Sequence, residues 1–453
     1  MKRKAIAVLL VSTMVFSSVL GCSAPSGESG APASEPASGA STGGEETPTS
    51  GEPTPFTFWT YVEQHTEFFE DAANTWNENH PEEPIELSTE TYPVPDMHSK
   101  LLVTLQSGDG APDIVDVNVA RFSDFMQEGE EVFVPLNDII EPEKDHFLEP
   151  VLDIYKYNGN YYGLEYHVGA PTIFYNTEIL DMAGVKPEDI VTWDDFHEAG
   201  KKVLDATGKP MITFDVSDMW QSYIMMCMNG GDYFDADGNC IINSESNAEV
   251  LQFMLDMLND GTAATTPGGS IHTEEFYGYM AQGGTASLLE CFWYLNRFTD
   301  YMTELSGKIT VASPPVWEEG DPYPVFGGTG TAITVQCENQ DLAKRFLAEA
   351  KISPEGAGKI WTILGFDPLR WDIWDTDVTK QENKFTDYFG KDIFDVVLSM
   401  KGGYQKSNIT ASPKFSAASN LVNSNLLFQV LSEKSASPQD ALDAIAQEIE
   451  NTQ

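Results

Sequence analysis

The alternation of apolar and polar side chains predicts strands and helices in turn along the chain. Residues 56–61 (FTFWTY) alternate as a strand does, and residues 85–90 form a second such segment. Between them, apolar residues in 68–76 recur at the spacing of one helix face, and residues 97–105 repeat this spacing. Residues 113–118 are then predicted to be a short buried strand. Strands that alternate with helices favour a parallel sheet.

Capping residues predict further helices towards the C-terminus. Thr192 is a candidate N-cap, Asp195 completes a capping box, and Gly208 is placed to end the helix. Residues 339–350 carry the apolar spacing of another helix. Ser437, which is followed by a proline, is predicted to cap the last helix.

The first 55 residues predict export followed by a tether. Residues 1–4 are basic and residues 5–20 are apolar, a stretch shorter than the ~20 apolar residues of a bilayer-spanning helix and typical of a secretory signal. The sequence VLGC at 19–22 resembles the lipobox of bacterial lipoproteins, so Cys22 is the expected lipidation site. Residues 23–55 are almost all Ser, Gly, Ala, Pro, Glu and Thr, which predicts a flexible segment.

Composition and charge narrow the classes of function. The chain has 453 residues, with 25 Lys and Arg against 71 Asp and Glu, and a formal net charge of −46. Such a charge argues against sequence-independent nucleic-acid binding and against attraction to an anionic membrane surface. Hydrophobic residues make up 41 %, which is enough for one or more cores, and the length predicts about three domain-sized units.

Four cysteines follow Cys22, namely Cys227, Cys240, Cys291 and Cys337, and none has CxxC spacing. Four cysteines allow three pairings outside the cytoplasm, of which Cys227 with Cys240 is the closest in sequence. Buried free thiols are the alternative. No metal site is expected.

Two motifs that suggest other chemistry have simpler interpretations. Gly328-x-Gly330 is followed by the strand-like residues 332–335 and not by the helix that a dinucleotide loop requires. Residues 235–239 resemble part of a calcium loop, but Tyr233 and Ser244 stand where that loop needs acids, so a hairpin turn is predicted. No P-loop or HExxH sequence occurs, and no cofactor is expected.

A series of weak motifs follows one order along residues 56–453. They are 69–81, 111–115, 160–164, 174–176, 192–196, 284–293, 327–333, 343–347 and 441–444. Together they resemble the extracellular solute-binding proteins of bacterial ABC importers, in particular those that bind sugars and oligosaccharides. The resemblance implies an α/β fold of the two-lobe periplasmic-binding-protein type (type II) with a ligand cleft between the lobes. It implies a first lobe of 56–166 plus 312–375 and a second lobe of 167–311 plus 376–453.

Candidate ligand residues are aromatic or polar and lie near strand ends or in loops expected to face the cleft. Ligands of open parallel sheets bind beyond the carboxyl ends of strands. Sugar rings favour Trp or Tyr platforms, with planar polar groups that bond to the hydroxyls. The candidates are Trp59, Glu63, Asp116, Asn118, Trp220, Glu290, Trp293, Arg370 and Trp371.

The resemblance therefore implies a lipid-anchored, extracytoplasmic, monomeric receptor without enzymatic activity. It would capture a carbohydrate by hinge closure and deliver it to separate ABC permease subunits, with hinges at 165–170, near 309–313 and near 375. A receptor for a peptide, polyamine or metal is an alternative. A secreted carbohydrate-active enzyme, which would need a pair of catalytic carboxylates, is the alternative from another class.

Overall fold

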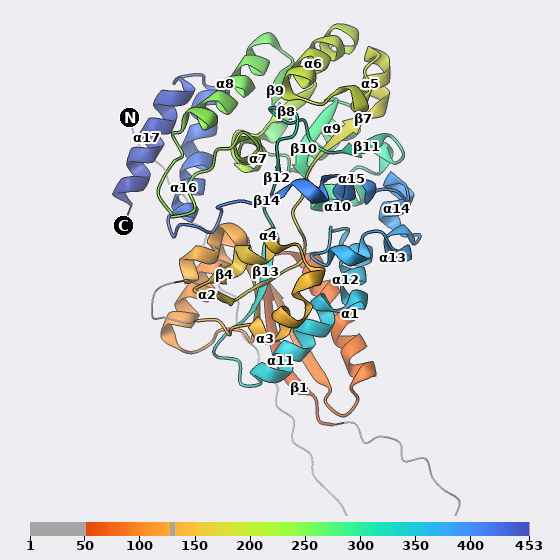
Figure 1. The fold of residues 1–453 in the computed structure, drawn as a ribbon, viewed down its shortest axis with the longest axis vertical. Coiled ribbons are helices and arrows are strands. Elements are labelled where there is room, and N and C mark those ends of the chain that lie inside the picture. The colour runs from red at the N-terminus through yellow and green to blue at the C-terminus, as the bar shows by residue number, and fades with distance from the viewer. Residues whose placement is uncertain (1–50, 127–131, 453) are drawn as a thin grey trace, which may run out of the picture. The chain divides into compact units, whose positions relative to one another are not determined.

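Two five-stranded sheets organise the part of the chain that the computed structural model describes, residues 51–126 and 132–452 (Figure 1). The first sheet has the order β2-β1-β3-β13-β6. Its strands are β1 (Thr54–Thr60), β2 (Ile85–Thr91), β3 (Ile114–Asn118), β6 (Leu164–Glu165) and β13 (Thr329–Ile333). β1 pairs in parallel with β2 and β3, whereas β13 is antiparallel to β3 and β6. In this sheet the expectation of parallel strands is correct for β1, β2 and β3, whereas β13 returns from a distant part of the chain and is antiparallel.

The second sheet has the order β11-β7-β10-β8-β9 and is also mixed. Its strands are β7 (Pro171–Asn176), β8 (Ile212–Phe214), β9 (Ala263–Thr265), β10 (Ser287–Cys291) and β11 (Ile309–Ala312). β8 is parallel to β9 and β10, and β7 is antiparallel to β10 and β11. Two short pairs complete the strands: β4 (Lys156–Tyr157) with β5 (Asn160–Tyr161), and β12 (Tyr323–Val325) with β14 (Tyr404–Lys406).

Helices accompany both sheets. Those from the first part of the chain are α1 (Glu63–Asn79), α2 (Val94–Ser107), α3 (Asn137–Ile140) and α4 (Glu149–Leu152). Those between β7 and β11 are α5 (Thr177–Ala183), α6 (Trp193–Thr207), α7 (Trp220–Met228), α8 (Glu245–Asp260), α9 (Glu274–Ala281) and α10 (Leu295–Tyr301). The C-terminal part adds α11 (Gln340–Leu347), α12 (Pro354–Lys359), α13 (Asp377–Lys380), α14 (Lys384–Phe389), α15 (Asp395–Met400), α16 (Phe415–Leu421) and α17 (Pro438–Asn451).

The helix ends predicted from capping residues are confirmed. The Thr192 hydroxyl accepts the Asp195 N–H at 3.1 Å, and the Asp195 carboxylate accepts the Thr192 N–H at 2.9 Å, so the capping box of α6 is complete. Gly208 ends this helix in the left-handed conformation that glycine favours. Ser437 caps α17, where its hydroxyl accepts the Asp440 N–H.

The apolar helix face predicted for residues 68–76 packs into the core. In α1, Phe68, Phe69 and Trp76 are buried, and the ring centroid of Phe69 lies 4.5 Å from that of Phe58 in β1. The strands β7, β10 and β13 are buried at every position, as expected for strands covered on both faces.

The chain passes between the two sheets in segments that lie side by side. The Val168 carbonyl, between β6 and β7, accepts the Gly327 N–H at 3.0 Å, and the Val168 N–H donates to the Asp367 carbonyl at 2.9 Å. A hinge was expected near 309–313, but Ile309–Ala312 form the edge strand β11. The segment that lies beside the first crossing is the one around Gly327. The strand β12, which was expected in the first lobe, pairs with β14, which was expected in the second. The boundaries of the lobes stay a prediction.

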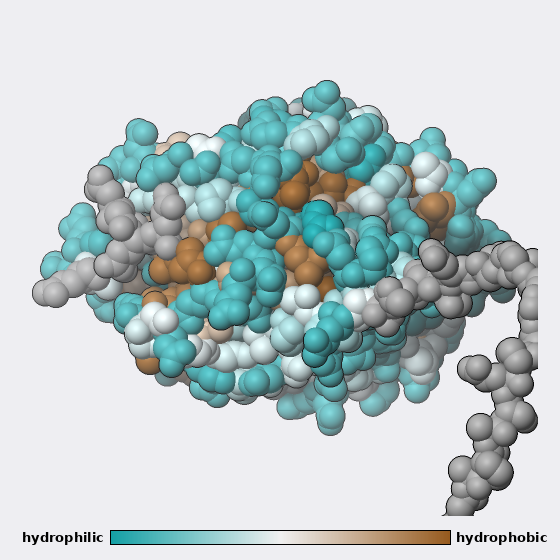
Figure 2. Space-filling model, turned by 90° about the horizontal axis from the view of Figure 1, so that it is seen from below, coloured by the Kyte–Doolittle hydropathy of each residue, from teal (hydrophilic) through white to brown (hydrophobic). Residues whose placement is uncertain are grey.

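Other expectations concern the cysteines, the surface and the N-terminus. Cys227, Cys240, Cys291 and Cys337 are all free, so the Cys227–Cys240 pairing is not formed. Phe234 and Cys240 form an antiparallel bridge around the predicted turn at 235–239. The face seen in Figure 2 is largely hydrophilic, with separate apolar areas among the polar ones. Residues 1–50, which include Cys22, lie outside the described residues. Among the described residues, no helix has both the length and the apolar character needed to cross a bilayer.

Candidate functional site

A cavity of about 310 Å³ is lined by residues that belong to both sheets and to the crossings between them. We call it the inter-sheet cavity. The residues attached to the first sheet are Tyr61, Val62, His65, Val94, Asn118 and Thr329. Those attached to the second sheet are Asp218, Trp220, His272, Cys291, Trp293, Asn296 and Arg297. The crossings contribute His167, Phe326, Gly327, Gly328 and Phe366.

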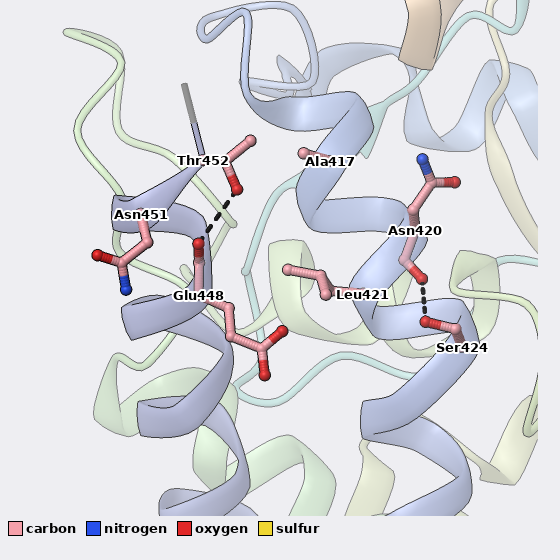
Figure 3. Close-up of a pocket in the computed structure, with 7 residues that line it drawn as sticks. All are labelled: Ala417, Asn420, Leu421, Ser424, Glu448, Asn451 and Thr452. Atoms are coloured by element: carbon pink, nitrogen blue, oxygen red, sulfur yellow. Dashed lines mark hydrogen bonds between the residues drawn. The ribbon is translucent and has the colours of Figure 1, made fainter.

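A second hollow, of about 460 Å³, lies between α16 and α17 near the C-terminus (Figure 3). Its lining consists of Ala417, Asn420, Leu421, Ser424, Glu448, Asn451 and Thr452. No aromatic ring lines it, and the Ser424 and Thr452 hydroxyls already donate to backbone carbonyls of their own helices. The inter-sheet cavity is therefore the candidate site.

Aromatic rings form much of the wall of the inter-sheet cavity. Trp220, the first residue of α7, packs edge-on against Phe326 with ring centroids 6.1 Å apart. Trp293, in the 3₁₀ turn Phe292–Tyr294 that follows β10, stacks on His272 with centroids 5.8 Å apart and planes 20° apart. Both Trp side chains are only partly buried, so each leaves ring surface for a ligand.

Several polar atoms of residues in this wall are buried and have no hydrogen-bond partner among the described residues. They are His167 Nδ1, Asn296 Oδ1 and Arg297 Nε. Buried polar atoms in proteins are almost always paired with protein, water or ligand. Donors and acceptors of this kind, set between aromatic rings, match a ligand that has both hydroxyl groups and apolar ring faces.

Burial shifts the pKa values of several ionisable side chains in the cavity wall and so determines which of them are charged. It raises the pKa of Asp218 to about 6, and it lowers the pKa of His272, which also feels the charge of Arg297, to about 4. Burial lowers the pKa of His167 to about 3. At neutral pH both imidazoles are therefore neutral, whereas Asp218 is mainly an ionised acceptor.

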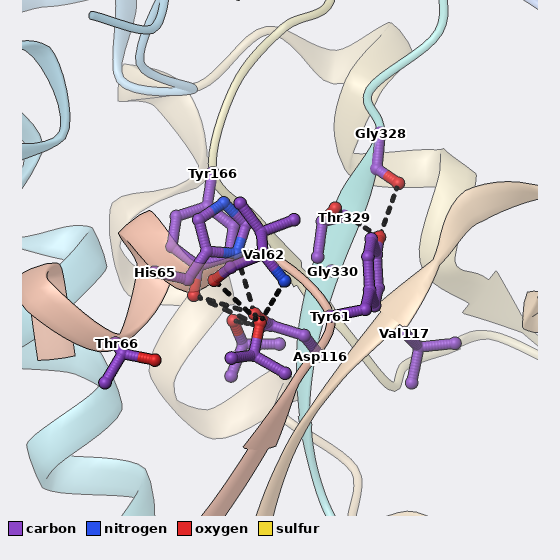
Figure 4. A network of polar contacts seen from close by, with 12 residues as sticks. Tyr61, Val62, His65, Thr66, Asp116, Val117, Tyr166, Gly328, Thr329 and Gly330 are labelled. Atoms are coloured by element: carbon purple, nitrogen blue, oxygen red, sulfur yellow. Dashed lines mark hydrogen bonds and ion pairs between the residues drawn. The ribbon is translucent and has the colours of Figure 1, made fainter. Parts of the chain in front are cut away.

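A buried polar network supports the wall on the side of the first sheet (Figure 4). Asp116, at 0 % exposure, accepts the Thr60 hydroxyl at 2.7 Å, the Tyr166 hydroxyl at 3.1 Å and the Thr331 hydroxyl at 2.8 Å. It also bonds to His65 Nδ1 at 2.8 Å. Because the His65 ring stacks on Tyr166 as well, its position in the cavity wall is fixed from two directions.

Backbone and side-chain contacts place Asn118 and Tyr61 next to each other. The Asn118 N–H donates to His98 Nε2 at 3.0 Å, and His98 Nδ1 donates to the Val94 carbonyl at 2.8 Å. The Asn118 amide donates to the Tyr61 hydroxyl at 3.3 Å, and the Tyr61 hydroxyl is also hydrogen-bonded to Thr329. The end of β3 thus presents its polar side chain to the ligand space together with a tyrosine of the loop after β1.

The glycines before β13 are held by a buried carboxyl group. Glu165 accepts the Gly328 N–H at 2.9 Å and the Thr329 N–H at 3.1 Å, and burial raises its pKa to about 8. Gly327 has a φ of +59°, and a Cβ there would lie 2.0 Å from Glu165 Oε1. Only glycine therefore fits where this crossing borders the cavity.

Three of the nine predicted ligand residues line the inter-sheet cavity: Asn118, Trp220 and Trp293. Asp116 and Glu290 are fully buried and absent from the lining. Asp116 positions His65. The Glu290 carboxyl has no partner among the described residues, and burial, followed by the charges of Asp218 and Asp215, raises its pKa well above the usual range.

The other four predicted residues lie away from the cavity lining for identifiable reasons. Trp59 is covered by Tyr92 and by Lys100, whose ammonium lies 3.8 Å from the ring centroid. Glu63 is exposed at the start of α1. Arg370 is held by Glu143, Asp372 and the Ile352 carbonyl, and the Lys401 ammonium lies 2.9 Å from the ring centroid of Trp371.

Sequence reasoning did not find Tyr61, His65, His167, Asp218, His272 or Arg297. Asp218 lies two residues before the predicted Trp220, but no local pattern distinguishes Asp218 or His272 from surface residues. Their convergence depends on the pairing of β10 with β7 and β8, which no short motif encodes. Within the described residues, no group of three or more His, Cys, Asp and Glu side chains is arranged to hold a metal ion.

Comparison with known proteins gives a consistent result. The model of the family "Bacterial extracellular solute-binding protein" matches residues 63–356. The arabinooligosaccharide-binding protein of Bacillus subtilis (strain 168) is 42% identical over 454 residues, which cover 99% of this chain and 99% of that protein. The arabinooligosaccharide-binding protein of Halalkalibacterium halodurans is 44% identical over 395 residues, 87% of this chain and 88% of that protein.

A solved structure has a similar fold. It is the ABC transporter associated binding protein from B. animalis subsp. lactis Bl-04 in complex with beta-1,6-galactobiose, with a TM-score of 0.73. The alignment covers 88% of this chain and 97% of that chain at 20% sequence identity. At this identity the likeness concerns the fold.

Proposed function

Because the chain belongs to the family of bacterial extracellular solute-binding proteins and has an α/β two-lobe periplasmic-binding-protein fold, we propose that it captures an oligosaccharide for an ABC importer. The ligand that we propose is an arabino-oligosaccharide. The similarity to two proteins named for that ligand, at 42% and 44% identity over most of the chain, supports this choice.

The observation that carries the proposal is the composition of the inter-sheet cavity. Trp220 and Trp293 offer ring surfaces, and His167, Asn296 and Arg297 offer polar atoms without protein partners among the described residues. Aromatic rings bind the C–H faces of a sugar, and the polar atoms bond to its hydroxyls. A protonated polyamine has donors only and would leave the Arg297 Nε–H without an acceptor.

The charges favour a neutral ligand. The only full charges at neutral pH among the residues that line the cavity are Arg297 and mainly Asp218, which together supply donors and an acceptor. The formal net charge of −46 repels anions at long range. A neutral sugar is not repelled by this net charge.

Ligand contacts from both sheets would be complete only when the lobes close on the sugar. The crossings around Val168, Gly327 and Asp367 are hydrogen-bonded to one another, which makes them the natural axis for such a motion. A ligand shifts the balance between open and closed forms only by its difference in affinity for the two. In the proposal, the two-sided lining supplies that difference.

The proposal includes membrane anchoring through a lipid on Cys22 and delivery to separate permease subunits. The VLGC sequence supports the anchor. Cell fractionation of a Cys22→Ala variant is expected to find the protein released from the membrane. A variant that stays membrane-bound without detergent would contradict the anchor.

Calorimetric titration of the purified protein tests the proposed ligand. Linear arabino-oligosaccharides are expected to bind with a one-to-one stoichiometry, and a peptide, a polyamine and lactose are the comparison ligands. Absence of heat with every arabino-oligosaccharide, together with binding of one of the others, would overturn the assignment.

A further inference from the structure

Two tyrosine rings form an aromatic stack next to the inter-sheet cavity. Tyr277 of α9 and Tyr301 of α10 lie with ring centroids 4.8 Å apart and planes 7° apart. Tyr277 is buried, whereas Tyr301 is 49% exposed. Tyr301 and Phe428 are the two exposed aromatic side chains among residues 51–126 and 132–452. The buried ring thus supports an outer ring that presents a face or edge to solvent.

Arg297 connects this stack to the cavity. Its guanidinium lies 6.0 Å from the centroid of Tyr301, and the same side chain lines the inter-sheet cavity. Arg297 and Tyr301 are four residues apart in α10, so they lie on one helix face about 6 Å apart along the axis.

The absence of an ion-pair partner for Arg297 among the described residues indicates that its guanidinium faces a ligand. Four arginines lie in the described part of this strongly acidic chain, and Arg121, Arg345 and Arg370 each form an ion pair with a carboxylate. Arg297 forms none within that part, and its Nε is buried without an acceptor. A planar guanidinium left unpaired beside a cavity is suited to the oxygen atoms of a ligand.

The small size of the inter-sheet cavity indicates how the stacked rings of Tyr277 and Tyr301 could contact a ligand. At about 310 Å³ it lies near the lower end of the range of ligand pockets, roughly 300–1,000 Å³. A long oligosaccharide would therefore continue beyond it, and the face of α10 that carries Arg297 and Tyr301 offers one path.

We propose that Tyr301, supported by Tyr277, is an outer subsite that stacks on a sugar ring of an oligosaccharide longer than the inter-sheet cavity holds. Arg297 bridges the inner and outer sugars. The inference rests on the proposed function and extends it, because it makes affinity depend on chain length through a named residue.

The test is calorimetric titration of wild type, Tyr301→Ala and Tyr301→Phe with linear arabino-oligosaccharides from the disaccharide to the hexasaccharide. Tyr301→Ala is expected to lose about tenfold in affinity for the longest ligand, about 1.4 kcal/mol, and to bind the disaccharide as wild type does. Tyr301→Phe retains the ring and is expected to behave as wild type. Phe428→Ala, which removes the other exposed ring, is the matched control and should leave every affinity unchanged.

Two results would overturn the subsite. One is a Tyr301→Ala variant that binds all lengths as wild type does, and the other is an equal loss at all lengths, which would place Tyr301 inside the inner site. Failure of wild type to bind any of these ligands is a separate result, because it contradicts the proposed function itself.

Discussion

Trp293 and Trp371 are both half-buried tryptophans that follow predicted cleft-facing segments, but they have different neighbours. Trp293 borders the inter-sheet cavity, whereas Trp371 lies under Lys401 and is absent from the lining. The pair therefore allows a comparison between a tryptophan that lines the cavity and one that does not.

We predict that Trp293→Ala weakens oligosaccharide binding by about 1–3 kcal/mol, the scale of losing one large buried apolar side chain. Trp371→Ala is the control and should bind as wild type does. Calorimetry of both variants measures the difference. Equal affinities in the two variants would contradict the role of Trp293.

Asp218 predicts a pH dependence of binding. Its ionised form accepts hydroxyl hydrogen bonds, and burial raises its pKa to about 6. Protons added as the pH falls through 6 convert the acceptor to a neutral acid, so affinity should fall between pH 7.5 and pH 5. The neighbouring imidazoles of His272 and His167, with pKa values of about 4 and 3, stay neutral over this range.

Two other buried acids, Asp215 and Glu290, titrate at higher pH than Asp218. Burial raises the pKa of Asp215 to about 8 and raises that of Glu290 well above its usual value, so both are largely protonated below pH 7. Calorimetry of Asp218→Asn from pH 5 to pH 7.5 is expected to give a weak but constant affinity. An unchanged pH profile in this variant would assign the dependence to another group.

Residues that line the inter-sheet cavity could be predicted from the sequence only where a local signal exists. Asn118, Trp220 and Trp293 have one, because they follow a strand or begin a helix and belong to residue types that bind sugars. Arg297 and His167 have no such signal. They are candidates because the fold buries Arg297 Nε and His167 Nδ1 without a hydrogen-bond partner among the described residues. Trp59 had the right type and place, but its ring is covered by Lys100 and Tyr92.

At the scale of elements, local rules predicted more. The capping box at Thr192 and the cap at Ser437 are confirmed because they depend on residues within one helical turn. The direction of β13 could not be predicted, because antiparallel pairing with β3 and β6 joins segments far apart in the chain.

We predict that adding one methyl group at Gly327 lowers the free energy of unfolding strongly. In Gly327→Ala the new Cβ meets Glu165 Oε1, and that carboxyl group cannot move without releasing the Gly328 and Thr329 N–H groups. Gly184→Ala is the matched control, since Gly184 also has positive φ but has nothing within 4 Å of a Cβ.

The control should lower the free energy of unfolding by roughly 1–2 kcal/mol, the cost of a left-handed alanine. Gly327→Ala should lower it by a further 1–3 kcal/mol or so, the cost of leaving buried groups unpaired. Chemical denaturation of the two variants gives both values. Equal losses would mean that Glu165 adapts freely and does not hold this crossing.

At the scale of the whole molecule, the order of weak motifs predicted the family and the two-lobe fold, and both are confirmed. Family membership also confirms the expectation of a solute-binding protein and not an enzyme. The sequence could not name the ligand, because sugar identity depends on the positions of side chains from both sheets.

The most direct test of the central claim is a crystal structure of the chain saturated with a linear arabino-oligosaccharide. We predict that the sugar lies in the inter-sheet cavity, with Trp220 and Trp293 against its rings and with Arg297 and Asn118 bonded to its oxygens. The lobes should have closed on it, while the internal structure of each stays unchanged. Sugar bound elsewhere, such as in the hollow between α16 and α17, or bound by residues of one sheet alone, would contradict the account.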